Sequence, residues 1–313
     1  MRVQMVFIIL HYGDKSLTDR AISSLMNLQD IEKSRIIIVD NGSPNGSGRE
    51  LTKAYANSSI VEVILLENNL GFSKGNNKGY AYAKEQYNAD FFIFMNNDII
   101  IHDRHFIEKI YTEYRRVTFY VAGPDVYVPQ IMYHSSPLRR ERISSVELEN
   151  EIERNRVLIQ ECEKSNSKFL KRKYNKEIRF GNNPFRYCLI AIKRLLLGER
   201  QVKWREDQGN YFVLQGSFLI VDKRFIVSCD KAFAPETFLY AEEYILSARC
   251  RKNGWNIRYL PTVCVYHTCQ GSLKAQEPGY KEYCDKMKRS AEYSIQALEI
   301  YKQYDETEEN VKL

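Results

Sequence analysis

Residues Phe91-Phe-Ile-Phe-Met-Asn-Asn-Asp98 decide which fold this sequence can adopt. Five consecutive large apolar residues indicate a strand buried on both faces, and such strands belong to parallel sheets covered by helices. The strand stops at Asn96, Asn97 and Asp98. In open α/β sheets the carboxyl ends of the strands carry the ligand-binding side chains, so these residues are candidates for a functional site. Because Asn and Asp also favour turns, a plain exit from strand to loop is the alternative.

Three more strands precede this one. The apolar runs 3–10, 35–39 and 60–66 predict strands, and helices are expected from Ser16 and over 73–87. The alternation βαβαβαβ predicts a right-handed, largely parallel, doubly wound α/β sheet.

A Gly-rich loop, 69–79, follows the third of these strands. Glycines let the backbone approach a ligand closely, and the N-terminus of the following helix favours a phosphate. The loop matches neither the dinucleotide fingerprint nor a P-loop, so a tight turn into a packed helix is the alternative.

The composition is that of a globular protein. The chain has 313 residues, of which 44% are hydrophobic and 27% charged, and it can bury one large core or two modest ones. Seven cysteines without a Cys-x-x-Cys pair indicate free thiols in a reducing compartment. No run reaches about 18 apolar residues, the length of a membrane-spanning helix. We therefore expect a cytoplasmic protein, either free or peripheral on the inner face of the cell membrane.

The net charge of +6 is concentrated in one segment. Residues 168–205 contain twelve Lys and Arg against two Glu, a net charge of +10, so the rest of the chain carries −4. Apolar residues interleave with these charges, which favours a basic amphipathic surface that lies on anionic lipid. An insertion whose apolar face packs on the sheet domain is the alternative. No recognised nucleic-acid motif accompanies the charge, so nucleic acid is not an expected partner.

Two further segments are predicted to be helical. Residues 143–162 combine helical spacing with alternating charges, which is typical of a solvated helix. Apolar residues recur every three to four positions over 280–298 and predict a long, packed C-terminal helix. Residues 305–313 are expected to form a frayed tail.

Several motifs, in this order, resemble those of family 2 glycosyltransferases with the GT-A fold, and most closely the bacterial polysaccharide rhamnosyl- and galactosyltransferases. The resemblance covers roughly 3–125 and 210–270, and the order is more specific than any single motif. The motifs are Ile8-Ile-Leu-His-Tyr12, Val39-Asp-Asn-Gly-Ser43, Asn69-Leu-Gly-Phe-x-x-Gly-Asn76, Asn96-Asn-Asp98, Gln215-Gly-Ser217, Phe238-Leu-Tyr-Ala-Glu-Glu243, Arg249, Gly254 and Tyr266-His267.

The resemblance implies how the chain is divided. Residues 1–129 would form a Rossmann-like half that binds a nucleotide sugar, and 206–275 the acceptor and catalytic half of the same GT-A domain. Residues 130–205 would be a basic, mainly helical insertion, and 276–313 a C-terminal helix and tail. The residues expected to bind the nucleotide sugar are His11, Tyr12, Asp40, Asn41, Gly71, Gly75, Asn76, Asn96 and Asn97.

Asp40 is implied to accept a hydrogen bond from N3–H of uracil or thymine, although capping the turn through Ser43 is its alternative role. The usual Asp-x-Asp of the family is Asn96-Asn-Asp98 here, so only one carboxylate is left for a divalent cation, Mn²⁺ or Mg²⁺. The resemblance offers His267 as a second ligand, although an isolated His is often a structural hydrogen-bonder. Such a cation would stabilise the departing diphosphate.

The acidic pair Glu242-Glu243 follows the aromatic lead that the family shows before its catalytic base. Adjacent residues on a helix point about 100° apart, so only one of the two carboxylates can face the acceptor hydroxyl. The resemblance assigns the base to Glu243 and places Glu242 beside it; a solvated pair at a helix N-terminus is the alternative. The family often has an Asp two positions later, where this chain has Ile245.

The function implied is inverting transfer of a sugar from a UDP- or dTDP-linked donor to a growing, lipid-linked bacterial glycan. Glu243 would act as general base in a single in-line displacement. Two alternatives stay open. One is a catalytically inactive relative that binds a nucleotide sugar or a partner transferase, and the other is a sugar nucleotidylyltransferase on a similar sheet.

Overall fold

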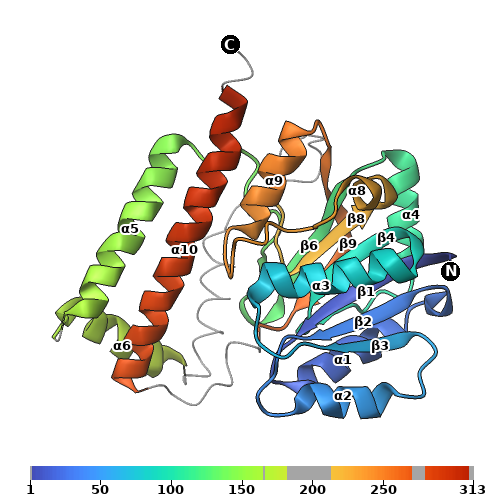
Figure 1. Ribbon diagram of the computed structural model, residues 1–313, viewed down its shortest axis with the longest axis horizontal. Helices are drawn as coiled ribbons and strands as arrows, with labels where there is room; N and C mark the ends of the chain where they lie inside the picture. Colours follow the sequence, from blue (N-terminus) through green and yellow to red (C-terminus); the bar gives the residue numbers. More distant parts are fainter. Residues whose placement is uncertain (1, 165, 182–212, 270–278, 310–313) are drawn as a thin grey trace.

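The computed structural model describes residues 2–164, 166–181, 213–269 and 279–309. Figure 1 shows two layers of helix around one twisted sheet, and a long helical hairpin beside them. The strands are β1 (Arg2–His11), β2 (Arg35–Asp40), β3 (Val61–Leu65), β4 (Asn88–Asn96), β5 (Ile99–Ile100), β6 (Val121–Val128), β7 (Tyr133–His134), β8 (Phe218–Asp222) and β9 (Ile257–His267).

The helices of the sheet domain are α1 (Lys15–Met26), α2 (Ser47–Tyr55), α3 (Gly71–Gln86), α4 (Phe106–Arg116), α8 (Lys223–Ser228) and α9 (Glu242–Lys252). α5 (Ser145–Glu163) and α10 (Tyr280–Glu309) are far apart in the sequence but lie side by side and antiparallel, and this pair is called the hairpin below. α6 (Lys168–Gly181) covers one end of the pair. Two short 3₁₀ helices are η1 (Ile31–Lys33) and η2 (Pro129–Ile131).

The first four strands form the parallel sheet that the sequence predicts. Their order is β3-β2-β1-β4, and each neighbouring pair is parallel. Every residue from Phe91 to Met95 is buried, because helices cover both faces of this sheet. The boundaries differ only at the ends: β4 begins at Asn88, β3 covers 61–65 rather than 60–66, and α3 begins two residues earlier than expected.

The second half of the sheet is mixed. β8 lies between β4 and β6 and is antiparallel to both, and β5 and β7 are also antiparallel to their neighbours. The strand expected at 262–266 is the end of the longer β9, which is parallel to β6. A largely parallel sheet therefore describes the first half only. Residues 218–222 and 257–267 belong to the same sheet as the nucleotide half.

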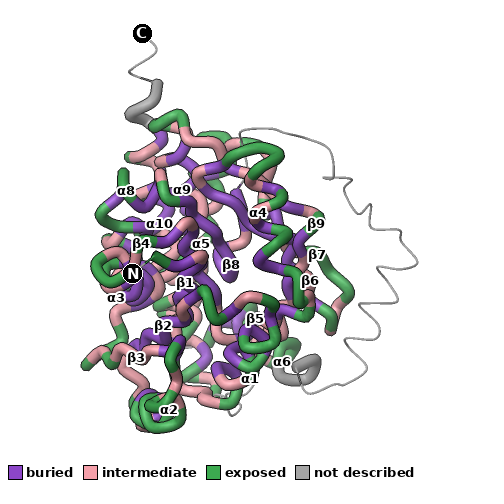
Figure 2. The backbone as a smooth tube through the Cα atoms, turned by 90° about the vertical axis from the view of Figure 1, so that its right-hand side faces the viewer, coloured by how far each residue is buried: buried purple, intermediate pink, exposed green. Residues whose placement is uncertain are grey.

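Two apolar cores lie on the two faces of the sheet. One lies under α1, α2 and α4, and the other lies under α3, α8 and α9. Figure 2 shows the strands as the buried part of the chain, with exposed residues gathered on the outer helices and loops. Because every helix of the sheet domain buries one face, the loops at the carboxyl ends of the strands have a rigid base.

The insertion and the C-terminal helix pack together as an antiparallel hairpin. α5 begins with a capping box, in which Ser144 and Glu147 satisfy each other's backbone amides. Lys302 pairs with Glu149 near one end of the hairpin, and Lys288 pairs with Glu163 near the other. α10 also packs on α9, and its apolar positions enter a third core. The packed C-terminal helix is therefore confirmed, although it extends through Glu309 rather than ending before the expected tail.

Candidate functional site

A polar network joins the ends of β1 and β4 to the first turn of α2. His11 is fully buried, with Nδ1 2.7 Å from Thr18 Oγ1 and Nε2 2.8 Å from Ser47 Oγ. Asn97 Nδ2 donates to the same Thr18 hydroxyl at 3.1 Å. Burial lowers the pKa of His11, so the ring is neutral and one ring nitrogen donates while the other accepts. His11 therefore holds the loops in place rather than presenting a free nitrogen to a ligand.

Tyr12, the next residue, is 51% exposed and lies at the surface of the same edge. A cavity of about 460 Å³ opens here between the loops that follow β1 and β2. Asn45 Nδ2 donates to the Gly13 carbonyl at 2.7 Å, and the Gly13 amide donates to Ser43 Oγ at 2.9 Å. These contacts fix the two loops against each other beside the cavity.

Asp40 caps the turn below that cavity. Its Oδ1 accepts hydrogen bonds from the Ser43 amide at 3.2 Å and from the Ser43 hydroxyl. Its other oxygen lies against Gly48 so closely that a Cβ there would overlap it. Asp40 is only 6% exposed. Asp40 therefore has the turn-capping role that the sequence left open. Its expected hydrogen bond to a pyrimidine base stays a prediction.

Asn41 organises the Gly-rich loop. Its amide donates to Asn69 Oδ1 and to the Gly71 carbonyl, both at 3.0 Å, and its carbonyl accepts from the Leu70 amide at 3.0 Å. Gly75 lies on this side chain, because a Cβ there would meet Leu10 and Asn41. The packing places the N-terminus of α3 at the edge where β2 and β3 end.

Two other residues of this loop have structural contacts. Asn76 is 1% exposed, and its amide donates to the Phe72 carbonyl at 3.0 Å. Gly71 has φ +79°, which glycine adopts without strain, and its Cα faces the Phe238 carbonyl and ring. The Phe72 amide donates to that same carbonyl at 2.8 Å. The segment before α9 is thus attached to the first turn of α3.

Asp98 and His267 meet at the ends of neighbouring chain segments. Asp98 Oδ1 lies 3.1 Å from His267 Nε2, and both side chains are mostly buried. β5 pairs Ile99 with His267, which brings the two residues together. Burial of the ring opposes protonation, but hydrogen bonds to Asp98 and Cys269 outweigh it and raise the pKa of His267 to about 10. The pair is therefore an ion pair at neutral pH.

These two side chains fit a divalent cation as a partial ligand set. A carboxylate and an imidazole are ligands that Mn²⁺ accepts, and two adjacent ligands of an octahedral ion with bonds of about 2.1 Å are about 3 Å apart. The observed 3.1 Å separation matches that spacing. No group of three or more His, Cys, Asp or Glu suited to a metal occurs within 2–164, 166–181, 213–269 and 279–309. Any cation would take its remaining ligands from substrate and water.

The acidic pair opens α9 beside the end of β4. Glu243 Oε1 accepts a hydrogen bond from the Gly216 amide at 3.3 Å, and the Asn96 amide donates to the Ser217 carbonyl at 2.9 Å. Glu243 is therefore one short loop away from the Asn96–Asp98 turn. Burial raises the pKa of this carboxyl group.

Glu242 is 5% exposed, and its Oε1 has no hydrogen-bond partner among the described residues. Burial, together with the charge of Glu243, raises the pKa of Glu242 to about 8. A solvated pair at a helix start is therefore not what this chain has. At neutral pH Glu242 is predominantly protonated, and Glu243 has the backbone amide that stabilises an anion.

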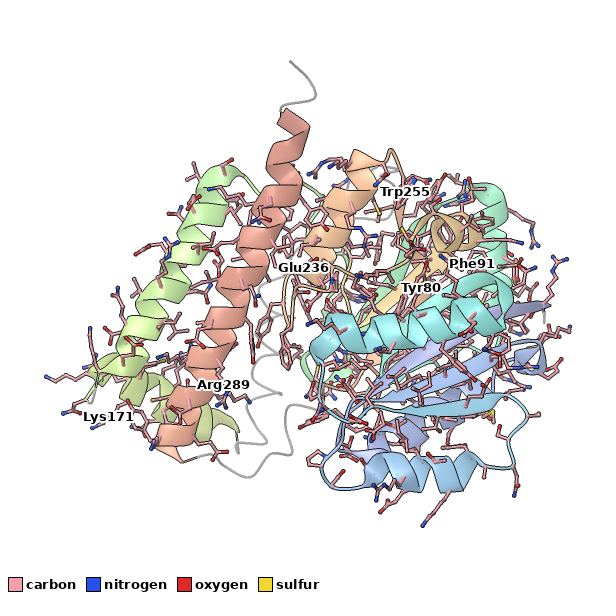
Figure 3. The ribbon with its side chains drawn as sticks, viewed as in Figure 1. Tyr80, Phe91, Lys171, Glu236, Trp255 and Arg289 are labelled. Carbon is pink, nitrogen blue, oxygen red and sulfur yellow. The ribbon has the colours of Figure 1, made fainter. Side chains whose placement is uncertain are left out.

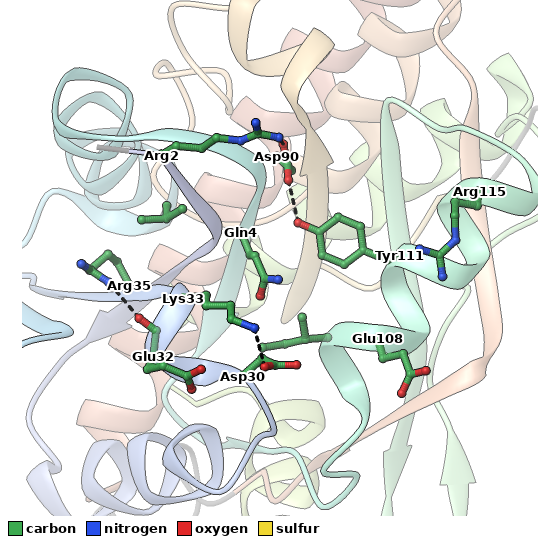
Figure 4. Close-up of a pocket in the computed structure, with 12 residues that line it drawn as sticks. Arg2, Gln4, Asp30, Glu32, Lys33, Arg35, Asp90, Glu108, Tyr111 and Arg115 are labelled. Carbon is green, nitrogen blue, oxygen red and sulfur yellow. Dashed lines mark hydrogen bonds and ion pairs between the residues drawn. The ribbon is translucent and has the colours of Figure 1, made fainter.

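A larger cavity, of about 660 Å³, lies at the opposite edge of the sheet, where β1, β2 and β4 begin. Figure 4 shows that its charged groups pair with one another: Tyr111 donates to Asp90, which also faces Arg2, and Lys33 pairs with Asp30. No residue expected to bind a nucleotide or metal lines it. The chemistry predicted from the sequence lies at the carboxyl edge instead.

Sequence reasoning missed four residues that connect the site: Thr18, Ser47, Asn69 and Phe238. Each is a partner of a residue that was expected, at a separation of up to 167 positions in the chain. A hydroxyl or a phenyl ring in a helix or loop carries no local signal of such a partner. Asn69 and Phe238 lay within motifs that the sequence singled out, but neither was given a role of its own.

Comparison with solved structures supports the fold. The S. aureus TarS fragment 1–349 is 13% identical over 91% of this chain and 69% of that chain, with a TM-score of 0.51. The same fragment in complex with UDP-GlcNAc aligns over 40% of this chain and about a third (34%) of that chain, with 18% identity and a TM-score of 0.34. No curated protein matches the sequence.

Comparison with family models gives a match over residues 6–192, described as glycosyl transferase family 2. The match covers more than half of the chain and extends from β1 past α6. Together with the mixed α/β sheet and its loops at the carboxyl edge, it agrees with the GT-A fold expected from the motifs. The chain belongs to glycosyl transferase family 2.

Proposed function

We propose that this protein transfers a sugar from a UDP- or dTDP-linked donor to a hydroxyl of a growing, lipid-linked bacterial surface polysaccharide, with inversion at the anomeric carbon. One observation carries the proposal. The cavity of about 460 Å³, the Asp98–His267 pair and Glu243 all lie at the carboxyl edge of one sheet. Hydrogen bonds through Ser47, His11, Thr18 and Asn97 connect the cavity to the turn that carries Asp98. A glycosyl transfer needs a site of this composition, in which a nucleotide, a diphosphate and a base are held together.

Glu243 is the general base in this proposal. It takes the proton of the acceptor hydroxyl as that oxygen bonds to the anomeric carbon, and the bond from this carbon to the diphosphate breaks. The Gly216 amide donates to Glu243 and favours its anionic form, whereas burial and the charge of Glu243 raise the pKa of Glu242 to about 8, so Glu242 keeps its proton at neutral pH. Burial raises the pKa of both carboxyl groups, and the charge of Glu243 adds to the shift of Glu242, which suits proton transfer near neutrality.

Asp98 and His267 would hold a divalent cation, which would supply Lewis-acid stabilisation of the departing diphosphate. Because His267 is protonated at neutral pH, it would ligate a cation only after losing that proton, so cation binding is expected to strengthen as pH rises. Asn97, anchored on Thr18, orients the turn that carries Asp98.

The attachment to a lipid-linked acceptor is supported by the basic end of the hairpin. α6 buries Leu170 and packs the Tyr174 ring edge-on against Tyr280 and Tyr283 of α10, so its apolar face packs on the hairpin. Its outer face is exposed and basic. Lys171 on α6 and Arg289 on α10 lie at the same end of the hairpin in Figure 3. The part of the basic segment from 182 to 205 lies outside the described residues.

Among the helices that the structure describes, none combines the length and the apolar character required to cross a bilayer. The membrane contact proposed here is therefore electrostatic, through exposed Lys and Arg with Phe169 beside them, which is 56% exposed.

The base assignment predicts a separation of transfer from nucleotide binding. Glu243→Gln keeps the hydrogen bond from Gly216 but cannot accept the proton, so transfer should fall by about 10² or more while UDP or dTDP binds normally. Glu242→Gln should lose less. Transfer is measured with labelled donor, and binding by calorimetry. If Glu242→Gln is the inactive variant, the two roles exchange. Near-native transfer by both variants would exclude both glutamates as the general base. A native protein that binds nucleotide but transfers nothing would support the inactive relative.

The raised pKa of Glu242 predicts how stability depends on pH. The folded pKa is about 8 and the unfolded value 4.5, so between these values the unfolded state releases a proton that the folded state retains. Glu242 therefore costs no stability below pH 4.5, and its cost grows as pH rises to about 8. Glu242→Gln should raise the melting temperature at pH 8 and change it little at pH 4.5. Glu153→Gln, at an exposed position of α5, is the matched control, and an equal response in both variants would contradict the prediction.

The metal proposal predicts cation-dependent nucleotide binding. Asp98 and His267 are too few to anchor a diphosphate alone, so UDP or dTDP affinity should fall at least tenfold when EDTA removes Mn²⁺. Calorimetry of the native protein, with Asp98→Asn and the control Asp103→Asn, measures this effect. Equal affinity with and without metal, or equal metal dependence in Asp98→Asn, would exclude these residues as ligands.

The membrane proposal predicts selective binding to anionic vesicles. Each basic residue near such a surface contributes about 1 kcal/mol, and salt screens the attraction. Arg172→Glu with Lys176→Glu on α6 should weaken co-sedimentation with phosphatidylglycerol vesicles at low salt. Arg49→Glu with Lys53→Glu on α2 changes the net charge equally and should have little effect. No preference of the native protein for anionic over neutral vesicles would end the proposal.

A further inference from the structure

A second polar cavity, of about 400 Å³, lies between the helical hairpin and the start of the catalytic helix α9. α5 supplies one wall, the residues just before and after the glutamate pair supply the opposite wall, and α10 supplies the floor. Its volume falls in the range of small-ligand pockets. The lining residues used below are Asn150, Glu151, Arg154, Tyr240, Tyr244 and Ser294.

The wall on the α9 side has an unusual backbone. Tyr240 and Ala241 have φ values of 77° and 55°, a conformation that residues other than glycine rarely adopt. This turn directs Tyr240 outwards, where the ring is 44% exposed and the hydroxyl accepts a hydrogen bond from Ser290 Oγ at 2.7 Å. Strained backbone of this kind clusters at ligand sites, and here it immediately precedes Glu242.

The chemistry of the lining favours a neutral polar ligand. Arg139 pairs with Glu147 and Arg154 pairs with Glu151, so the charges of the pocket balance. A phosphate would meet two carboxylates as well as two guanidinium groups. Tyrosine rings can instead pack on the C–H face of a sugar ring, while amide, carboxylate and guanidinium groups bind its hydroxyls.

We infer that this pocket binds a neutral sugar residue of the acceptor glycan, so that α5 and α10 contribute to acceptor specificity. The inference rests on the proposed function for the identity of its ligand. Residues 241 and 244 line the pocket, and Glu243 lies between them in the same turn of chain. Glu243 itself does not line the pocket, because its carboxylate is turned towards the Gly216 amide, so a sugar held there lies beside the first turn of the helix that carries the proposed base. The acceptor site thus extends beyond 206–275 into the insertion and the C-terminal helix.

The experiment blocks the pocket from α5. Asn150 is exposed, and Asn150→Trp places a large ring in the cavity at a position with no packing to lose. Glu153→Trp makes a similar change on the same helix outside the pocket. Saturation-transfer NMR measures binding of p-nitrophenyl glycosides of neutral hexoses, 6-deoxyhexoses and N-acetylhexosamines to each protein. We expect at least one glycoside to bind the native protein and Glu153→Trp, and at least tenfold weaker binding to Asn150→Trp.

The inference is overturned if the native protein binds none of these glycosides, or if Asn150→Trp binds them as tightly as the native protein. It is also overturned if only a phosphate-bearing probe, such as a sugar phosphate, competes for the pocket. Hydrolysis of UDP-sugars by the native protein, with water in place of an acceptor, tests the proposed function separately. Glycoside binding sensitive to Asn150→Trp without any hydrolysis supports the pocket and counts against the donor reaction. Hydrolysis of UDP-sugars without glycoside binding supports the donor reaction and counts against the pocket.

Discussion

The antiparallel pairing of β8 with β4 is the constraint on which the rest of the structure depends. It inserts a strand from the second half of the chain beside β4, the last strand of the parallel set, with Phe218 opposite Met95. The loop before β8 therefore lies against Asn96, and its Gly216 amide donates a hydrogen bond to Glu243 Oε1. Five buried backbone pairs in a closed apolar core leave little freedom for this register, because a shift of one residue would turn every side chain to the other face.

The site is held by polar contacts that are themselves buried. His11, Thr18 and Ser47 connect two helices with one ring, and Asn41 connects two loops with one amide. Buried polar groups that are fully paired specify a single arrangement, since each lost partner costs desolvation without compensation. Glu242 departs from this rule, with an unpaired oxygen beside a second carboxyl group.

The helical hairpin gives the enzyme two different ends. Near the sheet, Phe238 stacks on Tyr293 of α10 at 4.7 Å, which attaches the segment before α9 to the hairpin. At the far end, α6 closes over α10 through tyrosine contacts and leaves its basic face exposed. In the proposed function, this pair of helices would place a membrane-bound acceptor near the catalytic edge. The ion pairs Lys302–Glu149 and Lys288–Glu163 join α10 to α5 at two separate points.

The sequence by itself determined the parallel half of the sheet and the order of the motifs, since buried strands and helical periodicity are local signals. The polar residues after each strand could be named because a parallel sheet brings such ends to one edge. The antiparallel β8, the roles of Thr18 and Phe238, and the unpaired state of Glu242 depend on contacts between residues far apart in the chain. Likewise, the sequence identified α6 as basic and amphipathic, but only the tertiary structure decided that its apolar face packs on α10. Local pattern determines which face of an element is apolar, and the partner of that face is decided by the folded chain as a whole.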